Sequence, residues 1–153
     1  PRLKWPNDLL LERGKLAGVL LEMAAESDRV DWVVAGIGLN VQRPEDAPPE
    51  AAYLSDVVPG VRIPQAAAAV LDGIAQAYKE WADDGFESLR QEYERRSALD
   101  GREVTVSGLD GRVLAAGVAS GVDASGCLRV READGAERFV AAGDVTLRRP
   151  VSG

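Results

Sequence analysis

The stretch Gly14-Lys15-Leu16-Ala17-Gly18-Val19-Leu20-Leu21-Glu22 is a nearly continuous apolar run that one lysine interrupts close to its start. A second run, residues 32–41, is rich in valine and isoleucine. Runs of this kind predict strands that are buried on both faces of a sheet. The short polar segment between them, residues 26–29, predicts an antiparallel hairpin with a compact loop. Such a hairpin would bring the beginning of the first strand close to the end of the second.

The residues that follow the hairpin predict an irregular segment and then two helices. Prolines recur between residues 43 and 64 and exclude a long helix there. Pro64 suits the first turn of a helix whose apolar residues follow i, i+3 and i+4 spacing as far as Trp81, with Gly85 as its end. A second helix is predicted over residues 86–96, with its aromatic side chains on one face. The first hundred residues therefore combine a sheet with packed helices.

The last third of the chain has a different pattern, made of short alternating apolar runs. Turn-forming pairs separate these runs: Asp110-Gly111, Ser125-Gly126 and Asp134-Gly135. Turns at this regular spacing predict a small antiparallel β barrel or sandwich of about five strands. We therefore predict an α+β chain of two parts. Residues 1–99 would form part of a mixed or antiparallel sheet with helices, and residues 100–150 would form the barrel.

Composition excludes several classes of function. The chain has 153 residues and a formal net charge of -7, which argues against binding of nucleic acid or an anionic membrane through this chain. It has no histidine, so a Ser-His-Asp triad and histidine-based metal sites are excluded. The single cysteine, Cys127, cannot form an internal disulfide, and no apolar run reaches the ~20 residues of a membrane span. These features predict a cytoplasmic protein.

Lys15 is the first candidate functional residue. A lysine partly removed from water beside Gly14 can bind a carboxylate or a phosphate, although a lysine at a strand end also serves simply to reach solvent. In the second strand, period-two alternation places Gly36, Gly38 and Asn40 on one face. A face without side chains admits either a ligand close to the backbone or a closely packed helix.

The segment Trp5-Pro6-Asn7-Asp8 predicts a rigid turn, because proline restricts itself and the residue before it. Two interpretations remain open on these residues alone. In one, the turn serves only the backbone. In the other, Asn7 or Asp8 faces a nucleotide or its Mg²⁺ ion, which takes one or two carboxylates together with phosphate oxygens.

Three segments in this order, followed by the barrel, resemble the biotin protein ligase family. They are Lys4-Trp5-Pro6-Asn7-Asp8, the Lys15-x-x-Gly18 strand and the Gly36-x-Gly38-x-Asn40 strand. The resemblance implies the class II synthetase-like fold of biotin and lipoate ligases for residues 1–99, which would be a catalytic domain without its N-terminal part. It implies a C-terminal SH3-like barrel for residues 100–150.

The resemblance also implies a role for each matching residue. Lys15 would be the catalytic residue, contacting the biotin carboxylate and the adenylate phosphate. The biotin site would be bordered by Lys15, Gly18, Leu20, Gly36 and Gly38. The ATP or adenylate site would be bordered by Asn7, Asp8, Asn40 and Arg148. Because strict alternation puts Lys15 and Gly18 on opposite faces of their strand, both can border one ligand only if the strand bulges or twists there.

The implied reaction is the ATP-dependent activation of biotin to biotinyl-5'-AMP, with Mg²⁺. Transfer to a lysine of the biotin carboxyl carrier domain of a biotin-dependent carboxylase would follow. The family's glycine- and arginine-rich loop would lie upstream of Pro1, so the resemblance covers only the second half of the catalytic domain and the barrel. We therefore expect this chain alone to be a weak or inactive catalyst.

Two other functions fit the same residues. A lipoate–protein ligase would activate a different carboxylate with an equivalent lysine, although the Trp5-Pro6-Asn7-Asp8 turn and the compact barrel favour biotin. A non-catalytic docking or ligand-binding module would not require Lys15, so replacement of this lysine would leave partner binding intact. Whether the protein forms a homodimer through its sheet is left open by the sequence.

Overall fold

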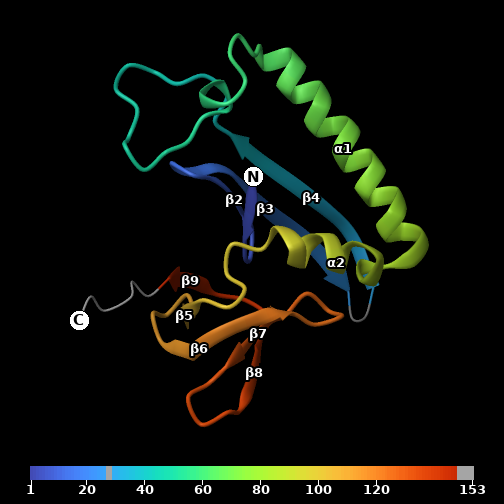
Figure 1. The fold of residues 1–153 in the computed structure, drawn as a ribbon. Coiled ribbons are helices and arrows are strands. Elements are labelled where there is room, and N and C mark those ends of the chain that lie inside the picture. The colour runs from blue at the N-terminus through green and yellow to red at the C-terminus, as the bar shows by residue number, and fades with distance from the viewer. Residues whose placement is uncertain (27–28, 148–153) are drawn as a thin grey trace. The chain divides into compact units, whose positions relative to one another are not determined.

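A computed structural model describes residues 1–26 and 29–147 of the chain (Figure 1). The chain divides into two compact units, one made of Pro1 with residues 7–70 and the other of residues 2–6 with residues from 71 onward. We call them the hairpin unit and the barrel unit. The predicted division into domains 1–99 and 100–150 stays a prediction.

The elements follow in chain order as the α+β class predicts. They are β1 (Arg2–Lys4), β2 (Asp8–Leu11), β3 (Gly14–Glu26), β4 (Arg29–Leu39), the 3₁₀ turn η1 (Leu54–Asp56), α1 (Ile63–Asp84), α2 (Phe86–Arg96), β5 (Glu103–Ser107), β6 (Val113–Val122), β7 (Leu128–Arg131), β8 (Glu137–Val140) and β9 (Asp144–Leu147). Gly85 separates the two helices with φ +72°, a conformation that glycine adopts without strain. Both predicted helices and the end between them are confirmed.

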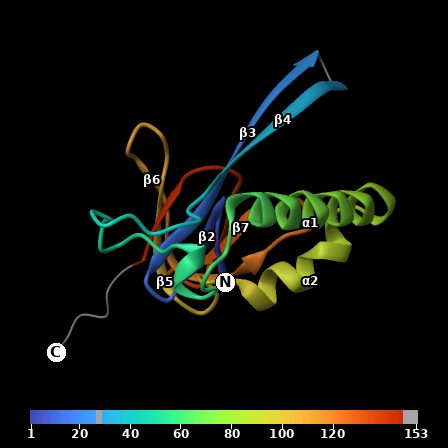
Figure 2. The same cartoon turned by 90° about the horizontal axis from the view of Figure 1, so that it is seen from above.

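In the hairpin unit, β2, β3 and β4 are antiparallel neighbours in one sheet. The predicted hairpin of β3 and β4 is confirmed, and Figure 2 shows the two strands side by side as one long, twisted ribbon. Gly18 lies opposite Gly38, and Leu20 lies opposite Gly36. Directly opposed residues of an antiparallel pair share a face. The register therefore brings the glycines of the two strands together.

The prediction that both strands are buried on both faces is wrong. Every residue of β4 from Arg29 to Gly38 is exposed, and so are Leu20, Leu21 and Met23 of β3. The apolar cluster of this unit gathers only at the beginning of β3, around Leu16, Ala17 and Ala52. The reason is that an apolar run reports strand propensity, whereas burial depends on whether a second layer covers each face.

The barrel unit is an antiparallel sheet in the order β8-β7-β6-β5-β9. Strands β5 to β9 contribute Val104, Val106, Ala115, Ala119, Val122, Leu128, Val130, Val140 and Val145 to one apolar core. Phe86 and Tyr93 of α2 pack against this core. The predicted turns are confirmed, with positive φ at Gly111, Gly126 and Gly135. In the residues that the structure describes, no ladder joins β8 to β9, so the sheet curves around its core without closing into the predicted barrel.

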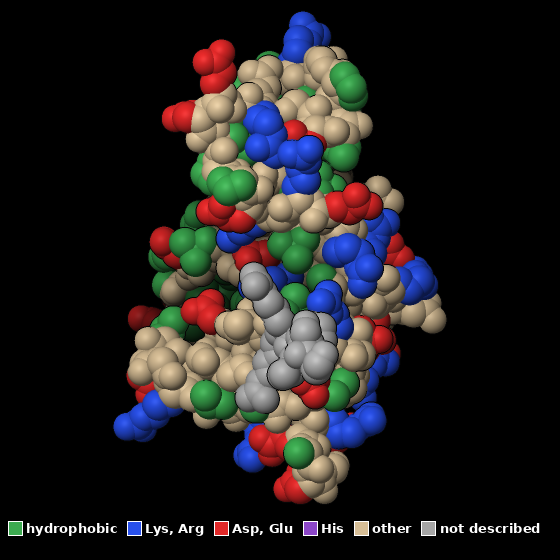
Figure 3. Space-filling model, turned by 60° about the vertical axis from the view of Figure 1, so that its left-hand side comes forward, with side chains coloured by type: hydrophobic (Ala, Val, Ile, Leu, Met, Phe, Trp, Pro, Cys, Tyr) green, Lys and Arg blue, Asp and Glu red, His purple; other side chains and the backbone are tan. Residues whose placement is uncertain are grey.

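Two surface properties complete the description. On the face drawn in Figure 3, acidic and basic side chains are interspersed. No helix in residues 1–26 or 29–147 combines the length and apolarity that crossing a membrane requires.

Candidate active site

A β-bulge at the beginning of β3 determines where the Lys15 side chain lies. Asp8 pairs with Gly18 and Leu9 with Ala17, but Leu10 then pairs with Lys15, so one residue of β3 is skipped. A bulge of this kind breaks strict alternation and turns side chains on either side of it to the same face. A Cβ atom on Gly18 would lie only 3.1 Å from Cε and from Nζ of Lys15. A shared Lys15–Gly18 surface requires that the strand bulge or twist there, and a bulge is present.

The Lys15 ammonium forms an ion pair with Asp8. Its Nζ lies 2.6 Å from Oδ1 of Asp8, and the two side chains are 55% and 18% exposed. An ammonium has three N–H donors, so this pair leaves Lys15 able to donate to a further anion from the solvent side. The turn residue Asp8 thus orients the lysine that follows it on the next strand.

A bare glycine surface continues from Lys15 along the sheet. Beyond Gly18, a Cβ on Gly38 would lie 4.0 Å from the Gly18 carbonyl oxygen, and a Cβ on Gly36 would lie 3.7 Å from the Leu20 carbonyl oxygen, which are the nearest described atoms outside the adjacent residues. A hollow of about 570 Å³ opens at the Lys15 end of this surface. It is lined by Lys15, Leu16, Ala17, Gly18, Gly38, Leu39, Asn40, Pro48, Glu50 and Ala51. Its volume is in the range of small-molecule sites.

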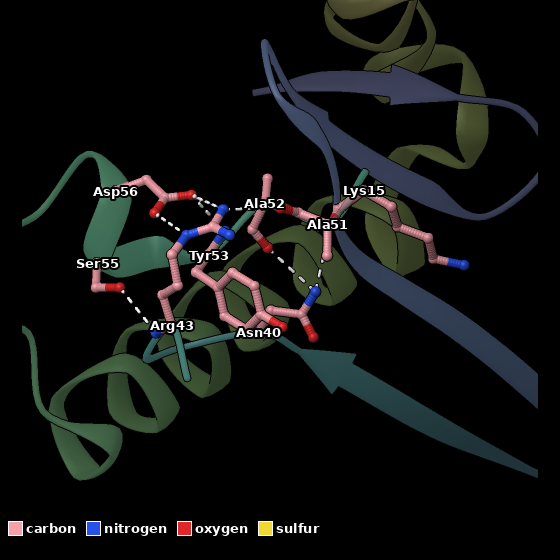
Figure 4. Close-up of polar contacts among 8 residues, drawn as sticks. All are labelled: Lys15, Asn40, Arg43, Ala51, Ala52, Tyr53, Ser55 and Asp56. Atoms are coloured by element: carbon pink, nitrogen blue, oxygen red, sulfur yellow. Dashed lines mark hydrogen bonds and ion pairs between the residues drawn. The ribbon is translucent and has the colours of Figure 1, made fainter. Parts of the chain in front are cut away.

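The side-chain amides of the two candidate asparagines donate hydrogen bonds to backbone carbonyl groups. Asn40 donates from Nδ2 to the carbonyl oxygens of Lys15 (3.2 Å) and Ala52 (3.1 Å), as Figure 4 shows. Asn7 donates from Nδ2 to the Val19 backbone carbonyl at 2.8 Å, and the backbone carbonyl of Asn7 accepts from the Val19 N–H at 2.9 Å. Both amide nitrogens are therefore engaged in fixing β3 beside its neighbours.

A group of residues that the sequence did not single out lies on the other side of the Lys15 backbone. Arg43 and Asp56 form a two-pronged ion pair, with Nε and Nη2 each 2.8 Å from a carboxylate oxygen. The Arg43 guanidinium, followed by the Tyr53 backbone N–H, holds the pKa of Asp56 well below its usual range. The only sequence signal for this pair is two opposite charges at either end of a proline-rich stretch, a weak indication of contact.

The predicted site residues fall into three groups. Lys15, Gly18, Gly38 and Asn40 line the hollow, and Asp8 contacts Lys15. Leu20 and Gly36 lie opposite each other farther along β3 and β4, and Asn7 binds β3 through its backbone and amide. Arg148 lies outside the described residues. Trp5, from the same sequence motif as Asn7, packs in the core of the barrel unit and donates from Nε1 to the Gly126 carbonyl at 3.0 Å.

Side chains that commonly bind metal ions do not cluster in the described part of the chain. Within residues 1–26 and 29–147, no group of three or more histidine, cysteine or acidic side chains could hold an ion.

Comparisons of the sequence give consistent relatives. Residues 101–148 match the family described as the biotin protein ligase C terminal domain. The chain is 38% identical over 153 residues to the biotin--[acetyl-CoA-carboxylase] ligase of Mycobacterium tuberculosis, covering 96% of this chain and 53% of that protein. It is 33% identical over 156 residues to the bifunctional ligase/repressor BirA of Bacillus subtilis, covering 95% and 46%. The chain thus spans about half the length of these curated relatives.

Solved structures agree with the sequence comparisons. The biotin protein ligase of Aquifex aeolicus in complex with biotin and ATP is 25% identical, with a TM-score of 0.76 over 97% of this chain and 62% of that one. Its apo structure gives a TM-score of 0.77, covering 97% and 65%. The chain is therefore homologous over nearly its whole length to the biotin protein ligases, and its residues 101–148 belong to the biotin protein ligase C-terminal domain family.

Proposed function

We propose that this chain carries the Lys15 side of the active site of an enzyme that activates biotin with ATP to biotinyl-5'-AMP and transfers it to a lysine of a biotin carboxyl carrier domain. The relatives named as biotin--[acetyl-CoA-carboxylase] ligases and the related structure titled as a complex with biotin and ATP support this reaction over lipoylation or simple docking. Residues 1–99 would then be the second half of the catalytic domain, and residues 100–150 the C-terminal SH3-like domain.

The observation that carries the proposal is the position of the Lys15 ammonium. It lies over the bare backbone of Gly18, beside the 570 Å³ hollow, and stays more than half exposed. A cation at the rim of a glycine-lined surface can hold a carboxylate and a phosphate at once, without side chains that would keep either ligand away from the sheet. Gly18, Leu20, Gly36 and Gly38 would border the biotin on this surface.

The chemistry requires no nucleophile from the protein. A carboxylate oxygen of biotin attacks the α-phosphorus of ATP, the bond to the bridging oxygen breaks, and pyrophosphate leaves with the electron pair. The acceptor lysine amine then attacks the carbonyl of the mixed anhydride, AMP leaves, and the amine loses a proton. The task of the protein is to bring two anions together and to stabilise charge at phosphorus. Lys15 is the described residue best placed for both.

The remaining roles follow from contacts around Lys15. Asp8 would orient the Lys15 ammonium, which would then bind the incoming phosphate in addition to Asp8. Mg²⁺ would accompany the phosphates of ATP. Asn7 and Asn40 would shape the nucleotide side by holding the backbone of β3. Arg148 would be a further nucleotide-binding residue. We propose a cytoplasmic location, because the single cysteine cannot form an internal disulfide and cytosolic proteins rarely contain one.

The decisive experiment is ATP–pyrophosphate exchange by the full-length protein, with biotin or lipoate as the acid. Exchange that depends on biotin and not on lipoate supports biotin activation. Exchange with lipoate alone would assign the site to a lipoate ligase. Folded protein that exchanges with neither acid would make Lys15 a structural lysine and leave a docking module as the function.

A further inference from the structure

Residues 43–56 form a loop whose two ends are fastened to each other. Arg43 contacts Asp56 through both Nε and Nη2, each at 2.8 Å, and the two side chains are only 27% and 17% exposed. The Arg43 backbone N–H also donates to Oγ of Ser55 at 3.1 Å. The guanidinium lies 4.6 Å from the centroid of the Tyr53 ring. Two-pronged arginine–carboxylate pairs fix geometry as well as charge. The loop is therefore closed at its base.

The far part of this loop lies along the backbone of Lys15. The Ala52 N–H donates to the Lys15 carbonyl at 2.9 Å, and the Lys15 N–H donates to the Glu50 carbonyl at 3.3 Å. These bonds make a short parallel bridge between Lys15 and Ala51. The loop thus continues the sheet for one step beside the catalytic candidate.

The ion pair at the base of the loop reaches this bridge directly. Arg43 donates from Nη2 to the Ala51 carbonyl at 2.8 Å, so one guanidinium holds both Asp56 and the segment beside Lys15. Figure 4 shows Arg43 and Asp56 on one side of the Lys15 backbone and the lysine side chain extending away from them. The contacts fix the backbone of Lys15, whereas its ammonium remains at the hollow.

The fit between loop and strand is tight. A Cβ atom on Gly14 would lie 1.7 Å from the Glu50 carbonyl oxygen, a distance that no side chain could occupy. Gly14 also has φ +150°, so a larger residue would be strained there as well. Any shift of residues 50–52 is therefore transmitted to the beginning of β3, where the bulge sets the direction of Lys15.

From these contacts we propose that Arg43 and Asp56 are positioning residues for Lys15, holding residues 50–52 against the bulged start of β3 so that the ammonium lies over Gly18. The inference rests on the proposed function for its catalytic consequence, but the positioning itself can be measured without catalysis. Neither side chain touches Lys15. Their effect is on the placement of a backbone, and a displacement of about 1 Å at a catalytic group can cost about 10²-fold in rate.

We call the Arg43–Asp56 ion pair, together with the bond from Arg43 to the Ala51 carbonyl, the clamp. The test compares variants of the full-length protein that keep different parts of it. Arg43→Gln removes the charge, and Asp56→Asn removes one charge but keeps an acceptor. Arg43→Lys keeps the charge and loses the planar two-pronged geometry, so it serves as the milder variant if Arg43→Gln folds poorly. Asp83→Asn is the matched control, because it breaks an exposed ion pair to Lys79 on α1.

Two readouts separate positioning from folding. The first is amide hydrogen exchange at Lys15 and Ala52, whose N–H groups bond across the bridge. We expect faster exchange at both in the clamp variants, with no change in Asp83→Asn. The second is biotin-dependent pyrophosphate exchange in two backgrounds. We expect a fall of about 10- to 100-fold when Lys15 is present and no further fall when Lys15→Ala is already in place.

Two outcomes would overturn the inference. One is unchanged amide exchange at Lys15 and Ala52 in both Arg43→Gln and Arg43→Lys. The other is an equal loss of activity in the presence and absence of the Lys15 side chain, which would mean that the clamp supports the fold in general. If the wild-type protein shows no biotin-dependent exchange, the proposed function fails, and the amide readout still decides whether the clamp holds Lys15.

Discussion

The hairpin unit and the barrel unit bury their apolar residues in different ways. The largest fully buried side chains of the described chain, those of Leu99, Val104, Val106, Val122 and Val130, all belong to the barrel unit. The hairpin unit has a small cluster at one end of its sheet, and next to it a surface of glycines with an exposed lysine. A site must leave polar groups and backbone open to a ligand, which the core of a domain cannot do. The comparison therefore predicts that substitutions in the hairpin unit change activity and those in the barrel unit change stability.

The strongest test of the comparison is Lys15→Ala. We expect biotin-dependent pyrophosphate exchange to fall about 10²- to 10³-fold, the usual cost of removing a preorganised group that stabilises developing charge. The free energy of unfolding should change by about 1 kcal/mol or less, because the ion pair with Asp8 is largely exposed on the lysine side. Exchange kinetics and urea unfolding of the same full-length protein measure the two effects. A variant with full exchange activity would end the assignment of Lys15.

The reciprocal test is Leu99→Ala in the barrel unit. Leu99 is fully buried in the apolar core, so we expect a loss of about 2–5 kcal/mol in the free energy of unfolding. The matched control is Leu21→Ala in β3, where the side chain is 61% exposed and the expected loss is about 0.5 kcal/mol. Urea unfolding followed by circular dichroism compares the two variants. Equal losses would show that the exposed leucines of the hairpin unit are covered in solution.

Local pattern was enough to predict most elements of both units. The strand at Gly14, the helix that stops before Gly85 and the Asp134-Gly135 turn each depend on residues close together in the chain, and all are confirmed. The bare surface at Gly36 and Gly38 could also be predicted from neighbouring residues, because alternation within one strand places both glycines on one face. The spacing of apolar residues, about 2 in a strand and about 3.6 in a helix, is a local property that does not depend on contacts with the rest of the chain.

The parts that the sequence did not predict all depend on contacts between distant residues. The exposed faces of β4 could not be foreseen, because the pattern assigns residues to faces without saying what covers them. A surface shared by Lys15 and Gly18 needed a bulge or a twist in the strand, but nothing in the apolar run showed that a bulge lies at Leu16. The clamp between Arg43 and Asp56 joins the two ends of a loop that has no periodicity. Such pairings leave no repeat in the sequence to detect.

A smaller effect is expected for Gly18→Ala, which sharpens the role of the hairpin unit. The added methyl group would lie 3.1 Å from Cε and Nζ of Lys15, so the ammonium must move. We expect kcat/KM for biotin in pyrophosphate exchange to fall about tenfold, with little change in stability. The matched control is Gly73→Ala on α1, where the new methyl group would have no described atom within 4 Å apart from the adjacent backbone of the helix. Wild-type kinetics in Gly18→Ala would mean that the contact between Lys15 and Gly18 has no catalytic use.

The smallest expected effect is an alkaline loss of stability that belongs to the barrel unit. Burial against the core raises the pKa of Tyr93 from its ordinary value of 10.0 to about 12. The folded state therefore keeps the phenol neutral where the unfolded state ionises it, so this contribution is complete below pH 10 and is lost as the pH rises to about 12. Because the ring is partly exposed, the loss should be about 1 kcal/mol.

Urea unfolding of the wild type and of Tyr93→Phe at pH 9 and pH 11 measures this contribution. The difference in unfolding free energy between the two proteins should change with pH, since phenylalanine has no proton to lose. Tyr78→Phe on α1 is the matched control for loss of a tyrosine hydroxyl, because the Tyr78 side chain is 64% exposed. If Tyr93→Phe and Tyr78→Phe follow the same pH dependence, burial of the Tyr93 phenol contributes nothing to stability, and the barrel unit is more open in solution than its apolar core indicates.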